Sequence, residues 1–222
     1  MLLDWSNIDT VLLDMDGTLL DLHFDNYFWL THLPRRYAEH FNLDLTIVTP
    51  QIHGHLMAHR GTLNWYSTDF WSRELNVDII ALKNEVKHLI NERPQALDLL
   101  KALGTAGKQQ ILVTNADRDS LKIKFKETAI GPHFNQTISS HDYGYAKEQP
   151  EFWQILRSEI GFNPDRTLFI DDSEAVLHSA QHYGIQYLRS IAQPDSKKIS
   201  DHTSAFNAIE NFQDLLCQVN AP

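Results

Sequence analysis

The stretch that decides the fold is Val11-Leu12-Leu13-Asp14-Met15-Asp16-Gly17-Thr18-Leu19. A short apolar run that ends in two carboxylates and a glycine predicts a buried strand over residues 10–13, followed at once by a turn. Side chains alternate along an extended chain, so Asp14 and Asp16 point the same way. In an open α/β sheet, ligands bind beyond the carboxyl ends of the strands. The pattern therefore predicts two acids at a binding edge, although a solvated Asp-Gly turn is the plainer alternative.

Two further apolar runs also end in polar residues. They are Gln109-Gln110-Ile111-Leu112-Val113-Thr114-Asn115 and Thr167-Leu168-Phe169-Ile170-Asp171-Asp172. Lys147 lies between these runs, in a segment with turn-forming residues. Taken alone, a threonine at a strand end is ordinarily structural and a loop lysine is ordinarily solvated. Their interest lies in the order in which they follow the Asp-x-Asp-Gly stretch.

The chain changes character between residues 20 and 93, where aromatic residues and histidines gather in long helical patterns. Strands alternating with helices resume after this stretch and predict a mostly parallel sheet covered on both faces. The predicted later strands are 110–114, 136–139, 167–170 and 185–188. The predicted helices of the long stretch are 26–40, 50–60, 62–75 and 79–91, and we expect a loop over 192–203 and a last helix over 205–218.

The expected fold class is therefore α/β, with a Rossmann-like, doubly wound sheet. Parallel strands need a crossover connection, and the connection after the first strand is far longer than one helix. We expect a core domain formed by residues 1–19 and 94–222. Residues 20–93 would form a helical cap, inserted after the first strand and lying over its carboxyl end.

Composition limits the classes of partner. The 222 residues are 42% hydrophobic, enough for a core, and the formal net charge of -10 argues against binding to nucleic-acid polymers or anionic membranes. No apolar run approaches the length that spans a bilayer. The single cysteine, Cys217, excludes an intrachain disulfide, and with no recognisable signal peptide this indicates a reducing, cytoplasmic setting.

The four motifs in this order resemble the haloacid dehalogenase (HAD) superfamily of phosphohydrolases, and the resemblance runs from Asp14 to Asp172. A carboxylate can attack phosphorus to give an aspartyl-phosphate, the role the resemblance implies for Asp14. It implies that Asp16 is the general acid and later the general base, with Thr18 nearby.

The remaining motifs are expected to hold the phosphoryl group. The Thr114 hydroxyl and the Asn115 backbone N–H are candidates to bind oxygens on which charge develops. The resemblance implies that Lys147 neutralises Asp14 and the phosphoryl group. The family often has proline after this lysine, whereas here Glu148 follows.

A divalent metal is the expected cofactor. The resemblance implies that Mg²⁺ is held by Asp14, by the Asp16 backbone carbonyl and by Asp172. Asp171 would act through water or would orient Lys147. Oxygen ligands together with a substrate phosphate and retained waters suit Mg²⁺. Capping of the following helix is the structural alternative for Asp171.

An aromatic run in the predicted cap includes Trp65 and Tyr66. Most such clusters belong to a core, but aromatic rings also stack on nucleobases. The sequences around Asp25, Trp65 and Tyr145 resemble the bacterial HAD-type 5′-nucleotidases that act on GMP and IMP. This resemblance implies purine nucleoside monophosphates as substrates.

The expected function is hydrolysis of a small phosphorylated metabolite by a monomer or homodimer, with no nucleic-acid polymer or membrane as partner. A HAD phosphatase or phosphomutase that acts on a small sugar phosphate is the enzymatic alternative. A phospho-receiver module also gathers acids, a threonine and a lysine around one aspartate, but it needs no large insertion after the first strand. A pseudoenzyme would ordinarily lack one of the acids or the lysine, and here all are present.

Overall fold

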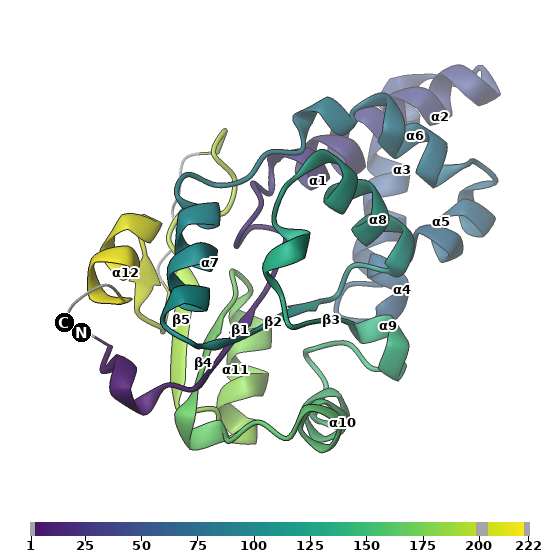
Figure 1. The fold of residues 1–222 in the computed structure, drawn as a ribbon. Helices are drawn as coiled ribbons and strands as arrows, with labels where there is room; N and C mark the ends of the chain where they lie inside the picture. The colour runs from purple at the N-terminus through teal and green to yellow at the C-terminus, as the bar shows by residue number, and fades with distance from the viewer. Residues whose placement is uncertain (1–2, 199–203, 220–222) are drawn as a thin grey trace.

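The computed structural model describes residues 3–198 and 204–219 of the chain. Within these residues, parallel strands form one six-stranded sheet in the order β3-β2-β1-β4-β5-β6 (Figure 1). The strands are β1 (Thr10–Leu13), β2 (Gln109–Thr114), β3 (Gln136–Ser139), β4 (Thr167–Ile170), β5 (Tyr187–Ile191) and β6 (Ala208–Ile209). The Rossmann-like α/β prediction is confirmed, and the direction in which strands are added reverses between β1 and β4.

Helices cover both faces of the sheet. They are α7 (Ala96–Thr105), α8 (Arg118–Glu127), α9 (Ser140–Tyr143), α10 (Pro150–Ile160), α11 (Glu174–Tyr183) and α12 (Phe212–Val219). Val11 and Leu13 pack in the same buried cluster as residues of α7 and α12, whereas Leu12 packs in a second cluster with residues of α10 and α11. Because alternate residues face opposite sides, a strand covered on both faces must be apolar throughout, as β1 is.

Two predictions near the C-terminus are wrong in their boundaries. The fifth strand runs over Tyr187–Ile191 rather than 185–188, and it includes the buried polar residues Arg189 and Ser190. The predicted helix over 205–218 begins only at Phe212, because residues 208–209 pair with β5 as β6. The predicted loop over 192–203 lies outside the described residues from residue 199 onward.

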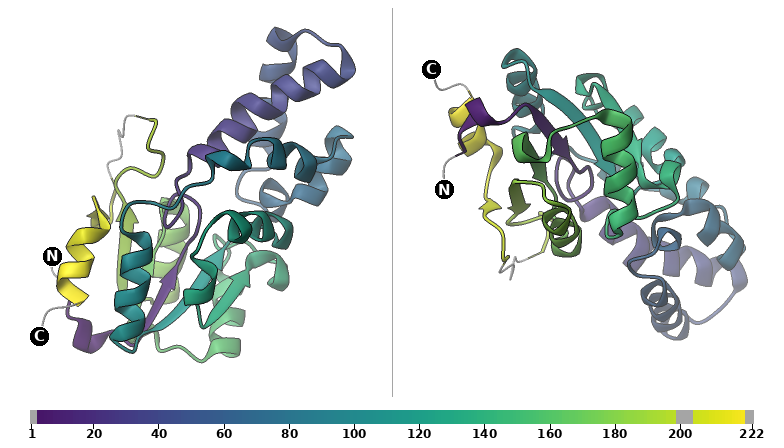
Figure 2. Two further views of the ribbon diagram at one scale, coloured as in Figure 1. Left: turned by 45° about the horizontal axis from the view of Figure 1, so that its top comes forward. Right: turned by 90° about the horizontal axis from the view of Figure 1, so that it is seen from below.

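A helical insertion lies between β1 and β2. Its elements are α1 (His23–Tyr27), a π-helical turn (Phe28–His32), α2 (Leu33–Phe41), α3 (Leu45–Ala58), α4 (Leu63–Tyr66), α5 (Thr68–Leu75) and α6 (Ile79–Glu85). Short 3₁₀ turns complete the assignment, at Trp5–Asn7, Lys87–Leu89, Gly131–His133 and Pro164–Arg166. Figure 2 shows the insertion extending from the sheet at the end of the molecule opposite to both termini.

Capping side chains explain where the insertion's helices differ from the predicted spans. The helix predicted over 50–60 begins at Leu45, because Asp44 accepts a hydrogen bond from the Thr46 N–H at 2.8 Å. The helix predicted over 62–75 is two helices, because Ser67 is extended and its hydroxyl accepts from the Phe70 N–H at 3.1 Å.

Two adjacent segments connect the insertion to the sheet. The N–H of Asp21 donates to the Asn91 carbonyl and the N–H of Arg93 donates to the Leu19 carbonyl, each at 2.9 Å. The chain therefore enters and leaves the insertion at one place, directly after the Asp-x-Asp-Gly turn. The domain division at residues 19/20 and 93/94 stays a prediction. None of the helices in the described ranges is long and apolar enough to cross a membrane.

Candidate active site

Three strands end together at one edge of the sheet. Leu13 of β1 lies beside Leu112 of β2 and Ile170 of β4. Because the strands are parallel, the residues that follow them emerge at the same edge. The structure thus brings Asp14, Thr114 and Asp171 to one place, as the apolar runs of the sequence predict.

Lys147 lies at the centre of this edge. Its ammonium group forms ion pairs with Asp14 Oδ1 and Asp171 Oδ2, each at 2.6 Å, and donates to the Val113 carbonyl at 3.1 Å. The Lys147 backbone is fixed as well, because its N–H donates to Asn115 Oδ1 at 2.9 Å. The side chain is 2% exposed, so this loop lysine is buried rather than solvated.

Carboxylates outnumber this cation. Oxygen atoms of Asp14, Asp171 and Asp172 all lie within 4.8 Å of one another. Burial raises the pKa of Asp14 to about 6, and the nearby Lys147 offsets only part of that rise. Burial, followed by the charges of Asp14 and Asp171, raises the pKa of Asp172 well above its ordinary value. Like charges this close repel one another unless a cation or a proton intervenes.

The donor set fits a hard divalent cation. Asp14 Oδ2 is buried and has no hydrogen-bond partner among the described residues. A buried, unpartnered carboxylate oxygen is costly unless something binds it. The neighbouring donors are all carboxylate oxygens, which suit Mg²⁺ better than a thiophilic metal.

Asp172 reaches the cluster across Gly17. The backbone of Gly17 has a φ of +84°, and a Cβ placed on it would overlap the Asp172 carboxylate, with Cγ at 2.6 Å. Two requirements therefore meet at this glycine: a left-handed backbone conformation and the absence of a side chain. The turn is closed by the Gly17 N–H, which donates to the Leu20 carbonyl at 2.8 Å.

Asp16 keeps some access to solvent. Its side chain is 20% exposed, and its Oδ1 forms an ion pair with the ammonium of Lys124 at 2.6 Å. Burial raises the pKa of Asp16 to about 6, against the opposing effect of Lys124. A carboxyl group with such a pKa can both donate and accept a proton near neutral pH.

The candidate phosphoryl ligands take different positions. The Thr114 hydroxyl accepts from the Ala116 N–H at 3.0 Å and keeps its own proton to donate. The hydroxyl of Thr18 is fully buried and has no hydrogen-bond partner in the part of the chain that the structure describes. The Asn115 side chain is used within the protein, because its amide donates to Glu148 Oε2 at 2.9 Å.

Of the two aromatic candidates, Trp65 and Tyr66, only Tyr66 is hydrogen-bonded to the residues around Lys147 within the described ranges. Its hydroxyl donates to Glu148 Oε1 at 2.7 Å and so connects α4 to the Lys147 loop. Burial, followed by the charge of Glu148, raises the pKa of Tyr66 and keeps the hydroxyl a donor. Trp65 takes no part in the cluster's hydrogen bonds within the described ranges; its carbonyl accepts from the Trp71 indole at 3.1 Å.

The sequence reasoning gave no role at the site to three residues: Glu148, Lys124 and Asp25, whose carboxylate lies 2.8 Å from the Lys124 ammonium. Glu148 appears there only as a departure from the family pattern, yet it bridges Tyr66 and Asn115. Lys124 belongs to a lysine-rich helix, and such lysines are ordinarily expected to be solvated. The helical spacing of Ser120, Leu121 and Lys124 could have indicated its burial, because these residues share the buried face of α8.

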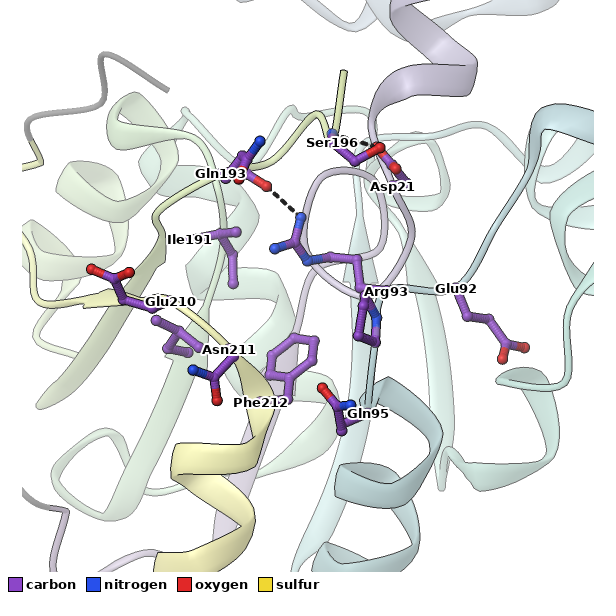
Figure 3. Close-up of a pocket in the computed structure, with 12 residues that line it drawn as sticks. Asp21, Glu92, Arg93, Gln95, Ile191, Gln193, Ser196, Glu210, Asn211 and Phe212 are labelled. Atoms are coloured by element: carbon purple, nitrogen blue, oxygen red, sulfur yellow. Dashed lines mark hydrogen bonds between the residues drawn. The ribbon is translucent and has the colours of Figure 1, made fainter. Parts of the chain in front are cut away.

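A separate cavity lies away from these residues. It has a volume of about 250 Å³ and lies where the connections to the insertion meet the C-terminal segment (Figure 3). Arg93 crosses it and donates to the Gln193 carbonyl at 2.5 Å, while the Ser196 N–H donates to Asp21. None of the predicted site residues lines it.

Sequence comparisons agree with the geometry. A family model described as haloacid dehalogenase-like hydrolase matches residues 8–184. The chain is 42% identical over 197 residues to the GMP/IMP nucleotidase YrfG of Escherichia coli strain K12, and the aligned region covers 86% of each protein. It is 25% identical to the pyrophosphatase PpaX of Bacillus pumilus over 81% of each.

A solved structure shows the same fold. The crystal structure of a HAD phosphatase from Thermococcus onnurineus superposes with a TM-score of 0.78, at 17% sequence identity, over 94% of this chain and 96% of that one. At this identity the likeness concerns the fold alone. The helical insertion is included in the match, because the coverage extends over nearly the whole of both chains.

Proposed function

Since the chain belongs to the haloacid dehalogenase-like hydrolase family, we propose that it is a Mg²⁺-dependent 5′-nucleotidase that acts on purine nucleoside monophosphates, GMP and IMP foremost. The observation that carries the hydrolytic part is the buried lysine, Lys147, between Asp14 and Asp171. The relative with 42% identity supports the substrate class. We further propose that the protein works in the cytoplasm, as a monomer or homodimer.

Asp14 is the proposed nucleophile. One carboxylate oxygen forms a bond to phosphorus while the bond from phosphorus to the ribose 5′ oxygen breaks, leaving an aspartyl-phosphate. The positive charge of Lys147 offsets the repulsion between the negative charges of Asp14 and the phosphoryl group. Thr18 and Thr114 supply hydroxyl donors for the phosphoryl oxygens, and the Asn115 backbone N–H supplies another.

Asp16 handles the protons. It gives its proton to the departing 5′ oxygen, which leaves as the nucleoside's hydroxyl. The resulting carboxylate then takes a proton from water as that water attacks the aspartyl-phosphate, releasing inorganic phosphate and restoring Asp14. The side chain of Asp16 is 20% exposed, so its carboxyl group is not closed off from a leaving group or a water.

The metal ligands are proposed as the carboxylates of Asp14 and Asp172 and the backbone carbonyl of Asp16. Asp171 takes an outer position, because one of its oxygens pairs with Lys147 and the other accepts from the Ser173 N–H at 2.8 Å. When bound there, Mg²⁺ would neutralise phosphoryl charge and orient the group for in-line attack.

The insertion, residues 20–93, is proposed to be the cap that recognises the nucleoside. Tyr66 places it against the Lys147 loop, and Trp65 lies next to Tyr66 on α4. A cap that closes over the site excludes bulk water and contacts the leaving group. GMP and IMP share a 6-oxopurine, so a cap that reads the base should separate them from AMP.

The test is inorganic phosphate release from a panel of phosphomonoesters with Mg²⁺. The panel contains GMP, IMP, AMP, pyrimidine monophosphates and sugar phosphates. We expect turnover of GMP and IMP, its loss in chelator, and a fall of more than about 10³-fold in Asp14→Asn. Asp165→Asn, at an exposed position, is the matched control. Turnover of sugar phosphates alone would overturn the substrate class, and full activity in Asp14→Asn would overturn the nucleophile.

A further inference from the structure

Four charges of alternating sign, of which the two lysines are buried, form a row that starts at Asp16. Lys124 lies 2.6 Å from Asp16 Oδ1 and 2.8 Å from Asp25 Oδ2. Lys83 lies 3.2 Å from the other oxygen of Asp25. The row runs from the end of β1 through α8 into α1 and α6, and so passes from the sheet side of the molecule into the insertion.

The two lysines are as buried as core residues. Lys124 is 2% exposed and Lys83 is 3% exposed. Their ammonium groups lie over the Phe24 ring, at 5.6 Å and 5.4 Å from its centroid. An ammonium group in such surroundings is tolerated only when carboxylates bind it closely. The arrangement therefore holds only while α1 lies against α8.

We propose that Lys124 and Asp25 are positioning residues for Asp16. Through them, the position of Asp16 as general acid depends on the packing of α1, in the insertion, against α8. The inference rests on the proposed hydrolysis of nucleoside monophosphates and deepens it. Lys124 carries three donors, enough to bind Asp16 and Asp25 together.

The step served by this arrangement is loss of the nucleoside. As the bond from phosphorus to the 5′ oxygen breaks, the proton of Asp16 moves to that oxygen and Asp16 becomes a carboxylate. The ammonium of Lys124 lies where that new negative charge appears. Asp25 holds the ammonium in place from the insertion side, so it acts on the reaction through Lys124.

The test compares two leaving groups in a single turnover with enzyme in excess. GMP releases an alcohol that needs a proton, whereas 4-nitrophenyl phosphate releases a stable phenolate that needs none. In Lys124→Met and in Asp25→Asn, we expect the rate of guanosine release to fall by on the order of 10²-fold, with less than about threefold loss for 4-nitrophenolate. Asp16→Asn should show the same selective pattern, at least as strongly.

The control is Lys122→Met, which removes an exposed lysine from the same helix and should leave both rates unchanged. Asp25→Asn preserves shape and keeps the test open if Lys124→Met does not fold. Equal losses with both esters in Asp25→Asn, beside a selective loss in Asp16→Asn, would overturn the inference and leave the nucleotidase intact. A wild-type enzyme that cleaves neither ester would overturn the proposed function and the positioning role with it.

Discussion

The carboxylate of Asp117 accepts two hydrogen bonds from Thr68, one from its backbone N–H and one from its hydroxyl, each at 2.6 Å to Oδ2. Its other oxygen accepts from the Ser120 N–H at 2.8 Å and caps α8. Asp117 follows β2 by three residues, whereas Thr68 begins α5. One buried carboxylate thus fastens the insertion to the sheet side beside the candidate active site.

Asp117→Asn is expected to lower the free energy of unfolding by about 2 kcal/mol at neutral pH. Burial raises the pKa of Asp117, but the hydrogen bonds from Thr68 and Ser120 outweigh burial and hold this pKa below its ordinary value. The carboxylate's contribution is then fully present above the unfolded-state pKa of about 4 and is lost as the pH falls through the lower folded-state pKa. Urea unfolding across pH measures the difference, which should shrink in acid.

The matched control for this variant is Asp119→Asn, which alters an exposed acid in the first turn of the same helix. It should change the free energy of unfolding by no more than about 0.5 kcal/mol. A difference for Asp117→Asn that grew as the pH fell would contradict the direction of the pKa shift.

Gly17→Ala is expected to damage the site more than an ordinary change of a left-handed glycine. Alanine at a φ of +84° costs about 1 kcal/mol, and its Cβ would also overlap the Asp172 carboxylate and move it. We expect Mg²⁺ activation of phosphate release to need at least about tenfold more metal, because a proposed ligand is displaced.

Gly161→Ala separates these two effects. Gly161 ends α10 with a φ of +75°, and no atom lies within 4 Å of a Cβ placed there. This variant should show the backbone cost alone, with an unchanged requirement for Mg²⁺. If both variants shifted the metal requirement equally, the contact between Gly17 and Asp172 would not be responsible.

The sheet and the centre of the site were predictable because each depends on local pattern. An apolar run that ends in polar residues marks both a buried strand and its functional end, so Asp14, Thr114 and Asp171 could be placed at one edge without knowing the packing. The same dependence on hydrophobic pattern explains why β5 was misplaced. Arg189 and Ser190 are buried within this strand, whereas a prediction from hydrophobicity alone ends the strand before them.

The residues that tie the insertion to the site were not predictable in this way. Asp25 and Lys124 are 99 positions apart, and their pairing depends on how α1 packs against α8. A lysine in an amphipathic helix is solvated in most proteins. The helical spacing of α8 separates Lys124 from its exposed neighbour Lys122, but it does not show which carboxylates Lys124 meets. Glu148 likewise acquires its role from two distant partners, Tyr66 and Asn115.

Tyr66→Phe is expected to raise KM for GMP by about tenfold, with a smaller change in kcat. The variant loses the hydrogen bond to Glu148 that holds α4 against the Lys147 loop. If the nucleotide binds to the arrangement in which α4 lies against the Lys147 loop, a lower population of that arrangement reduces the apparent affinity for GMP in proportion. Tyr37→Phe, on α2 of the same insertion, is the control and should leave KM unchanged. A fall in kcat alone would instead place Tyr66 in the chemical step.

Asp172→Asn is expected to have opposite effects on stability with and without metal. In chelator, it removes one of three carboxylates that repel one another, so the variant should unfold at the same or a higher temperature than the wild type. Saturating Mg²⁺ should raise the unfolding temperature of the wild type by about 5–10 °C, through binding to the native state alone. The variant should gain little, because it has lost a proposed ligand, so the wild type would then have the higher unfolding temperature.

Thermal unfolding followed by circular dichroism, with the exposed variant Asp98→Asn as control, gives both comparisons for Asp172→Asn. An equal rise in both proteins would show that Mg²⁺ binds elsewhere, while a large loss of stability in chelator would mean that Asp172 is held by partners other than a metal.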